Sequence, residues 1–213
     1  MGTIKKGILG GFSGKVGQVV GANWRGMDIM RSLPKKFGGE PTATQLEQRQ
    51  RFGLVMSFLS PLKGILEKTY GRSSGSKSKI NLAVSYHIRE AITGIVPNLE
   101  IDFSKVVISR GELLGPKAAE ISVDNDAEIK FNWEANSGTA LSNDDDKPIL
   151  VVYNPSKKLY VIEESNANRT ALEVILQLPA VFSGDLVHCW MGFVSADGRE
   201  SATSIYLGTV TVQ

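Results

Sequence analysis

The chain has 213 residues, of which 42% are hydrophobic and 22% are charged, a balance typical of a folded globular protein. Its single cysteine, Cys189, excludes an internal disulfide bond and a metal site built from several cysteines. The two histidines, His87 and His188, leave most zinc sites and catalytic triads incomplete, so we expect a non-enzymatic protein without cofactor or metal.

The sequence lacks the signals that direct proteins into or across membranes. No apolar run approaches the roughly 18 residues of a spanning helix. Glycines interrupt the N-terminal apolar residues too often for a signal peptide. We therefore expect a protein of the cytoplasm or of an assembled, virion-like particle, with neither a membrane nor a small-molecule substrate as its partner.

The net charge of +2 conceals an uneven distribution along the chain. Residues 1–90 contain 15 basic and 5 acidic residues, whereas residues 91–213 contain 9 basic and 17 acidic residues. The two stretches thus carry net charges of +10 and −8, which indicates two units with different surroundings. Either each unit meets opposite charge on a partner, or the difference only tunes solubility.

Residues 1–41 are predicted to form an arm, a hairpin and a linker. Glycine occurs seven times in residues 1–22 among apolar residues, so this segment is expected to stay loose until a partner holds it. Two runs, 18–23 and 27–31, flank Trp24-Arg25-Gly26 and predict a β-hairpin with a glycine in its turn. Prolines and glycines in residues 34–41 indicate a linker.

Two helices are predicted next. Thr44 and Glu47 have the spacing of a capping box, and the apolar residues of 55–66 repeat at intervals of three and four, as on one helical face. Pro61 is expected to break this helix, because proline lacks an N–H group. A second helix is expected over about residues 78–93, and the two helices should pack on each other with the arm and hairpin as partners.

From about residue 99 the apolar pattern changes to the alternation of β-strands. The expected strands are 106–109, 119–123, 129–133, 149–153, 159–162, 171–178, 186–195 and 204–212. Short strands at this spacing, without helices between them, are typical of an immunoglobulin-like or fibronectin-type sandwich. Trp133 alternates with polar residues and should lie in the core. The predicted fold is therefore α+β, with the arm, hairpin and helix pair in residues 1–98 and an acidic all-β sandwich in residues 99–213.

Several motifs that suggest chemistry lack their companion residues. The glycine-rich run 10–15 is too short between its glycines for a phosphate-binding loop. His188 and Cys189 are neighbours on an expected strand, so their side chains should point to opposite faces and cannot form a nucleophile–base pair. We expect His87, next to Ile88 on the second helix, to be a boundary residue between buried and exposed positions. The acidic run 143–147 lacks the ligand spacing of a calcium loop and is interpreted as a solvated tip.

Five stretches carry a resemblance to a known family. They are residues 7–17, Trp24-Arg25-Gly26, residues 31–34, 44–52 and 187–199. Together they resemble an uncharacterised bacterial family, the domain-of-unknown-function family 6266, over nearly the whole chain, and this resemblance implies no activity. The front half is also similar to short proteins of phage and prophage structural regions, in which a glycine- and valine-rich hairpin precedes a helix. That similarity implies a role in a particle or in assembly.

The candidate interaction residues are basic and aromatic side chains interleaved in the N-terminal segment. They are Lys5, Lys6, Phe12, Lys15, Trp24, Arg25, Arg31, Lys35 and Lys36. Such a set suits docking on an acidic neighbouring subunit, and it also suits neutralisation of phosphates and stacking on bases. We therefore expect a homo-oligomeric assembly protein that scaffolds a larger particle through its arm, with nucleic-acid binding or a merely solvated basic face as the alternatives.

Overall fold

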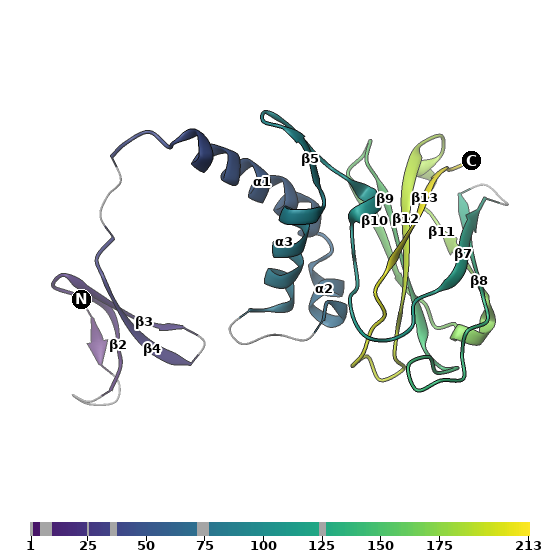
Figure 1. Cartoon of the computed structure of the whole chain (residues 1–213), viewed down its shortest axis with the longest axis horizontal. Helices are drawn as coiled ribbons and strands as arrows, with labels where there is room; N and C mark the ends of the chain where they lie inside the picture. The colour runs from purple at the N-terminus through teal and green to yellow at the C-terminus, as the bar shows by residue number, and fades with distance from the viewer. Residues whose placement is uncertain (1, 5–9, 25, 35–37, 72–76, 124–126) are drawn as a thin grey trace. The chain divides into compact units, whose positions relative to one another are not determined.

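The computed structural model describes residues 2–4, 10–24, 26–34, 38–71, 77–123 and 127–213 (Figure 1). The chain forms two compact units, Met1–Thr42 and Ala43–Gln213. They divide at the start of the first helix, whereas the sequence analysis placed the boundary between residues 98 and 99.

The first unit is an antiparallel sheet with the strand order β1-β2-β3-β4. Its strands are β1 (Thr3–Ile4), β2 (Phe12–Val16), β3 (Val19–Trp24) and β4 (Met27–Ser32). Strands β3 and β4 form the predicted hairpin, with Trp24 opposite Met27. The glycine-rich arm is not confirmed, because the described part of that segment pairs as strands β1 and β2.

The second unit begins with the helices α1 (Ala43–Leu59), α2 (Lys63–Thr69) and α3 (Lys79–Glu90). Helix α1 starts before Thr44, which therefore lies in its first turn rather than at its cap. The break at Pro61 is confirmed, since it falls between α1 and α2. Ser78 caps α3, because its hydroxyl accepts a hydrogen bond from the N–H of Asn81 at 3.3 Å.

Antiparallel strands form the rest of the second unit. A hairpin of β5 (Ile92–Ile95) and β6 (Asn98–Ile101) follows α3. The sandwich strands are β7 (Lys117–Ser122), β8 (Glu128–Glu134), β9 (Lys147–Asn154), β10 (Leu159–Glu164), β11 (Glu173–Gln177), β12 (Leu186–Val194) and β13 (Ile205–Thr211). They form two sheets with the orders β10-β9-β12-β13 and β11-β8-β7. The predicted all-β sandwich is thus confirmed.

The first expected strand, 106–109, is not a strand. The chain makes a 3-10 turn at Phe103–Lys105, after which the N–H groups of Ile108 and Ser109 donate to the hydroxyl of Ser204 at 2.9 and 3.3 Å. These N–H groups are thereby satisfied by a side chain instead of a neighbouring strand. Val106 and Ile108 are buried as the alternation predicts, but this segment forms no ladder of backbone hydrogen bonds with a neighbouring strand.

A hydrophobic core fills the space between the two sheets. Strand β8 contributes Ile129, Phe131 and Trp133, and strand β12 contributes Cys189 and other apolar side chains. Trp133 is 4% exposed, and its indole N–H donates to the carbonyl oxygen of Arg169 at 2.8 Å. The predicted core position of Trp133 is therefore confirmed.

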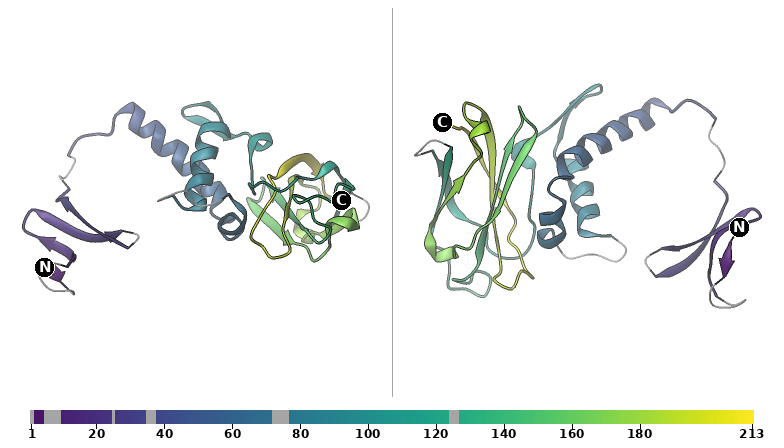
Figure 2. Two further views of the ribbon diagram at one scale, coloured as in Figure 1. Left: turned by 60° about the horizontal axis from the view of Figure 1, so that its bottom comes forward. Right: turned by 180° about the vertical axis from the view of Figure 1, so that it is seen from behind.

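The helices cover the other face of the sheet β10-β9-β12-β13 (Figures 1 and 2). The predicted apolar face of residues 55–66 packs there against side chains that include Ile149, Val151 and Trp190. Strand β9 is consequently buried on both faces, which explains why residues 149–153 read as a continuous apolar run.

This packing corrects two expectations. The sequence assigned the helix pair to the arm and the hairpin, whereas its apolar face packs on the sandwich. A boundary between residues 98 and 99 would separate the helices from the sheet that buries them, so helices and sandwich belong to one unit.

His87, expected at a boundary, is 1% exposed. Its Nε2 accepts a hydrogen bond from the N–H of Val107 at 3.2 Å, and its Nδ1 lies 2.8 Å from the carbonyl oxygen of Ala83. Both contacts are satisfied when the imidazole is neutral and Nδ1 carries the proton. Burial lowers the pKa of His87, which favours this neutral form.

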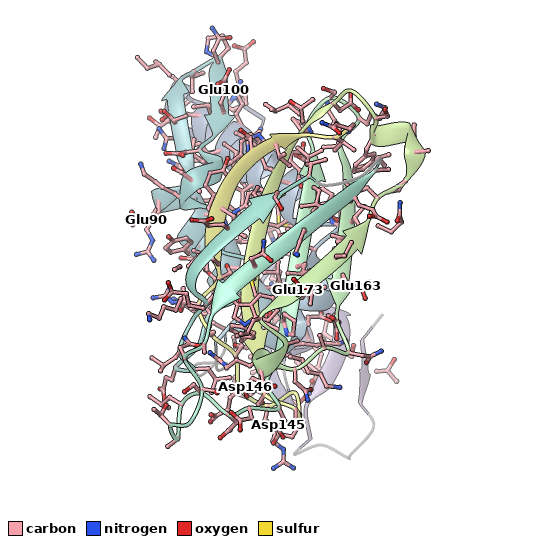
Figure 3. The ribbon with its side chains drawn as sticks, turned by 90° about the vertical axis from the view of Figure 1, so that its right-hand side faces the viewer. Glu90, Glu100, Asp145, Asp146, Glu163 and Glu173 are labelled. Atoms are coloured by element: carbon pink, nitrogen blue, oxygen red, sulfur yellow. The ribbon has the colours of Figure 1, made fainter. Side chains whose placement is uncertain are left out.

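The acidic loop 143–147 is not a uniformly solvated tip. Asp144 and Asp145 are exposed, but Asp146 is fully buried. Figure 3 labels Asp145 and Asp146 in this loop. Burial raises the pKa of Asp146, and the guanidinium of Arg169 opposes this rise from a distance of 3.0 Å.

Arg169 is a fully buried cation whose donors reach three residues. Its Nε and Nη2 lie 3.1 and 3.0 Å from Oδ2 of Asp146. Its Nη1 donates to the side-chain oxygen of Asn136 at 2.8 Å, and its Nη2 also donates to the carbonyl oxygen of Leu114 at 2.9 Å. The guanidinium carbon lies 3.9 Å from the ring centre of Phe193. This network joins the 143–147 loop to the sandwich core.

Candidate interaction surface

The structure describes part of the predicted interaction set. Lys5, Lys6, Arg25, Lys35 and Lys36 lie outside the described residues. The remaining four are Phe12 and Lys15 in β2, Trp24 in β3 and Arg31 in β4.

Strand register brings three of these residues to one face of the N-terminal sheet. Val20 in β3 pairs with Lys15 on one side and with Arg31 on the other, so the two cations flank Val20 in one row. Trp24 shares the face of Val20, because it lies an even number of residues along the same strand. Lys15, Trp24 and Arg31 are all exposed. We call this surface the basic face.

Phe12 lies on the opposite face. A Cβ atom at Gly21 would come within 2.6 Å of the Phe12 ring and within 2.1 Å of its carbonyl oxygen, so the β2 and β3 backbones meet closely at this glycine. Phe12 therefore packs against the sheet backbone on the face opposite the basic face, and its part in an interaction stays a prediction.

The N-terminal sheet has no hydrophobic core among its described residues. Gly21 is the single buried residue in the described part of the first unit. On the Phe12 face, Val16 is 53% exposed and Met30 is 73% exposed, and on the basic face Trp24 is 45% exposed and Met27 is 53% exposed. A small sheet needs a covered apolar face for independent stability. Both faces therefore offer apolar surface to a partner.

The methionines of β4 were not predicted as interaction residues, although the sequence contained a signal for them. Met27 and Met30 lie in a hairpin strand with few other apolar residues, and their exposure follows once no second layer covers the hairpin. Methionine adapts its shape to irregular partner surfaces, which suits an interaction site.

The sandwich offers the opposite charge on the outer face of the sheet β11-β8-β7, which points away from the helices (Figure 1). Register places on this face the acidic Glu120, Glu128, Glu134 and Glu173 and the basic Lys117 and Lys130. The two lysines form ion pairs with Glu134 and Glu173 at 2.8 and 2.7 Å, and the face keeps a negative balance. Ile175, 55% exposed, lies among these charges. We call this surface the acidic face.

The residues that most suggest chemistry do not form a reactive site. Cys189 lies in the core between the sheets, whereas His188 lies on the other face of β12 with its Nδ1 2.8 Å from the hydroxyl of Tyr206. Their predicted opposite orientation is confirmed. Burial raises the pKa of the Cys189 thiol to about 12, so the thiol stays protonated at neutral pH.

The described residues offer neither a group of metal-binding side chains nor a membrane-spanning helix. They hold no group of three or more His, Cys, Asp or Glu side chains that could bind a metal ion. No helix among them combines the length and the apolar character needed to cross a membrane.

Comparisons with known proteins give a family but assign no activity. A family of unknown function (DUF6266) matches residues 11–208. The fibronectin type III domain of the human collagen alpha-1(XX) chain is 13% identical, with a TM-score of 0.34 over 47% of this chain and 85% of that domain. The corresponding domain of human contactin 1 is 12% identical, with a TM-score of 0.32 over 67% of this chain and 96% of that one. No curated protein matches the sequence.

Proposed function

The chain belongs to this family of unknown function, and we propose that it is a non-enzymatic structural protein that self-associates through its N-terminal sheet. The observation that carries the proposal is the lack of a core in that sheet: its described residues bury Gly21 alone, while apolar side chains are exposed on both faces. An ordered sheet of this kind gains stability when a partner covers it.

A second copy of the chain is the partner that the charges favour. Residues 1–42 contain seven basic and two acidic residues, whereas the acidic face of the sandwich carries a negative balance. Lys15 and Arg31 would approach Glu120 and its neighbours, and Trp24 and Met27 would cover Ile175. Opposite charges would set the register of the contact, and the apolar side chains would supply most of its free energy.

Such a contact joins two different surfaces, the basic face of one copy and the acidic face of the next. Contacts of this heterologous kind repeat from copy to copy and produce rings or open filaments. The proposal therefore extends to a scaffold or a larger, phage-like particle built from many copies.

Sedimentation velocity of the full chain at low salt tests the proposal. We expect concentration-dependent association that the variant Lys15→Glu/Arg31→Glu weakens by roughly tenfold or more. The effect should fade as salt shortens the screening length to about 10 Å at 0.1 M. The control variant Arg49→Glu/Lys63→Glu makes the same change in net charge at exposed helical positions and should associate like the wild type. A chain that stays monomeric at high concentration contradicts the proposal.

Nucleic-acid binding is the second candidate, because two cations and an indole share the basic face. Fluorescence anisotropy with labelled duplex DNA and single-stranded RNA separates it from self-association. About five neutralised phosphates would give a log–log salt slope near −4 to −5 on duplex DNA. Binding of this kind, lost in Lys15→Glu/Arg31→Glu while the protein remains monomeric, would favour the second candidate.

A further inference from the structure

A cleft of about 690 Å³ lies within the second unit and shares no lining residue with the acidic face. Its described walls come from α3, from the segment that follows α2, from residues 110–112 and from the connection between β12 and β13. This volume falls within the range of about 300–1,000 Å³ that is typical of small-molecule sites. The cleft therefore has room for a ligand of metabolite size.

The walls of this cleft are predominantly cationic, and we call it the cationic cleft. Its basic residues are Lys77, Lys79, Arg89, Arg110 and Arg199, and its acidic residues are Glu112 and Glu200. These charged residues are spread over positions 77 to 200, so no local sequence motif predicts the cleft. The fold alone gathers these positive charges.

Arg110 is held in place by its backbone and its ring contact. Its N–H donates to the carbonyl oxygen of Thr69 at 3.0 Å, and its carbonyl oxygen accepts from the N–H of Gly71 at 2.6 Å. Its guanidinium carbon lies 5.5 Å from the ring centre of Tyr86, within the range of a cation–π contact. Arg110 forms no ion pair with a described carboxylate. Its positive charge is therefore not neutralised by a described carboxylate.

Arg89 adds a second guanidinium from the last turn of α3. Its Nε donates to the carbonyl oxygen of Ser85 at 3.1 Å, and it too lacks an ion pair with a described carboxylate. This differs from Arg169, whose guanidinium is fully satisfied inside the protein. Arg89 and Arg110 are both exposed, so their charges can be reached by a ligand from solvent.

Tyr70 contributes a buried donor to the same wall. It lines the cleft and is 2% exposed, and its hydroxyl, which lies near the guanidinium of Arg110, has no acceptor for its own proton among the described residues. Burial raises the pKa of Tyr70 to about 12, with the nearby Arg110 opposing the rise, so the hydroxyl keeps its proton at neutral pH. A buried donor without an acceptor is costly, and a bound anion would supply the acceptor.

We propose that the cationic cleft binds a small polyvalent oxyanion, either a phosphate-bearing or a carboxylate-bearing molecule. Arg89 and Arg110 would each offer the paired N–H groups that match the oxygens of such a group. Lys77 and Lys79 add point charges at the rim, and the hydroxyl of Tyr70 donates from the wall. This site is independent of self-association through the N-terminal sheet.

Isothermal titration calorimetry of the full chain tests this proposal, with sodium pyrophosphate and citrate as probes at constant ionic strength. We expect binding of one anion per chain by at least one probe, and the stronger probe identifies the phosphate or the carboxylate class. The variant Arg89→Gln/Arg110→Gln should weaken binding at least tenfold, and Tyr70→Phe should weaken it severalfold. The variant Arg49→Gln/Lys63→Gln removes the same charge outside the cleft and should bind within twofold of the wild type.

Urea unfolding of each variant checks that the fold is intact, and Arg110→Lys serves as a milder replacement if the double variant unfolds. This lysine keeps the charge but loses the paired donors, so it should bind more weakly than the wild type. If neither pyrophosphate nor citrate binds at concentrations up to about 10 mM, the proposal is overturned. Equal weakening by the cleft variant and the control variant also overturns it, because the anion would then respond only to net charge.

Discussion

Breaking the buried ion pair of Arg169 and Asp146 should be among the most destabilising changes in the protein. In Arg169→Met, the apolar side chain fills part of the space, but Asp146 loses its cation in a fully buried position. Asn136 and Leu114 lose their donors as well. Removal of one partner of such a pair typically costs about 3–5 kcal/mol. With a urea dependence of about 2 kcal/mol/M, the midpoint should fall by roughly 1.5–2.5 M.

The pH dependence distinguishes an unpaired charge from lost packing. Burial already raises the pKa of Asp146, and without Arg169 that pKa should rise further. The folded variant then takes up a proton as pH falls, so the loss of stability should be smaller near pH 4.5 than at pH 7. Asp146→Asn should show no such relief, because the arginine left behind cannot release its proton.

Urea unfolding followed by tryptophan fluorescence measures these changes, since Trp133 and Trp190 are buried in the same unit. The double variant Arg169→Met/Asp146→Asn should be more stable than the sum of the single losses predicts, by about 2 kcal/mol or more. If Arg169→Met lowers the free energy of unfolding by less than about 1 kcal/mol, and by the same amount at pH 4.5 and pH 7, Asp146 is not left as an unpaired buried charge.

Three further predictions follow from buried or closely approached groups. Burial lowers the pKa of His87 below its ordinary 6.5, so the unfolded chain takes up a proton before the folded chain does, and urea midpoints should fall as pH drops through 6.5. The variant His87→Gln should reduce this dependence of the urea midpoint on pH. An unchanged dependence would contradict a buried, neutral His87. Trp133→Ala should cost about 3–5 kcal/mol in urea unfolding, because it opens a cavity between the sheets; a loss below about 1 kcal/mol would show that the site collapses or is misplaced. Gly21→Ala brings a Cβ to within 2.1 Å of the carbonyl oxygen of Phe12, so amide NMR signals of the N-terminal sheet should shift or broaden while the unfolding of the second unit stays the same. Unchanged signals would exclude this strand pairing.

Local periodicity predicted most of the sandwich strands and the helices, and the apolar side of these elements. The repeat at three and four in residues 55–66 gave the helical face that is buried, and Pro61 gave the break. Alternation placed Trp133 inside the sandwich and set His188 and Cys189 on opposite faces of β12. These properties depend only on the geometry of one helix or strand, so neighbouring residues are sufficient to predict them.

The charge asymmetry was visible in the sequence, but the sequence did not show which charged side chains share a surface. The basic face requires the pairing of β2, β3 and β4 to put Lys15, Trp24 and Arg31 together. Phe12 belongs to the same stretch of sequence, yet the close approach at Gly21 assigns it to the other side. Register across strands decides this, and it depends on contacts between residues that a linear pattern does not connect.

Tertiary packing alone decided which apolar face meets which partner. The helices cover the outer face of the sandwich and so belong to its unit, and the same packing buries His87. The cationic cleft joins Arg89, Arg110 and Arg199 from three separate segments. An apolar face or a charged residue is compatible with many partners in the sequence, and the choice among them is made by the free energy of the whole packed unit.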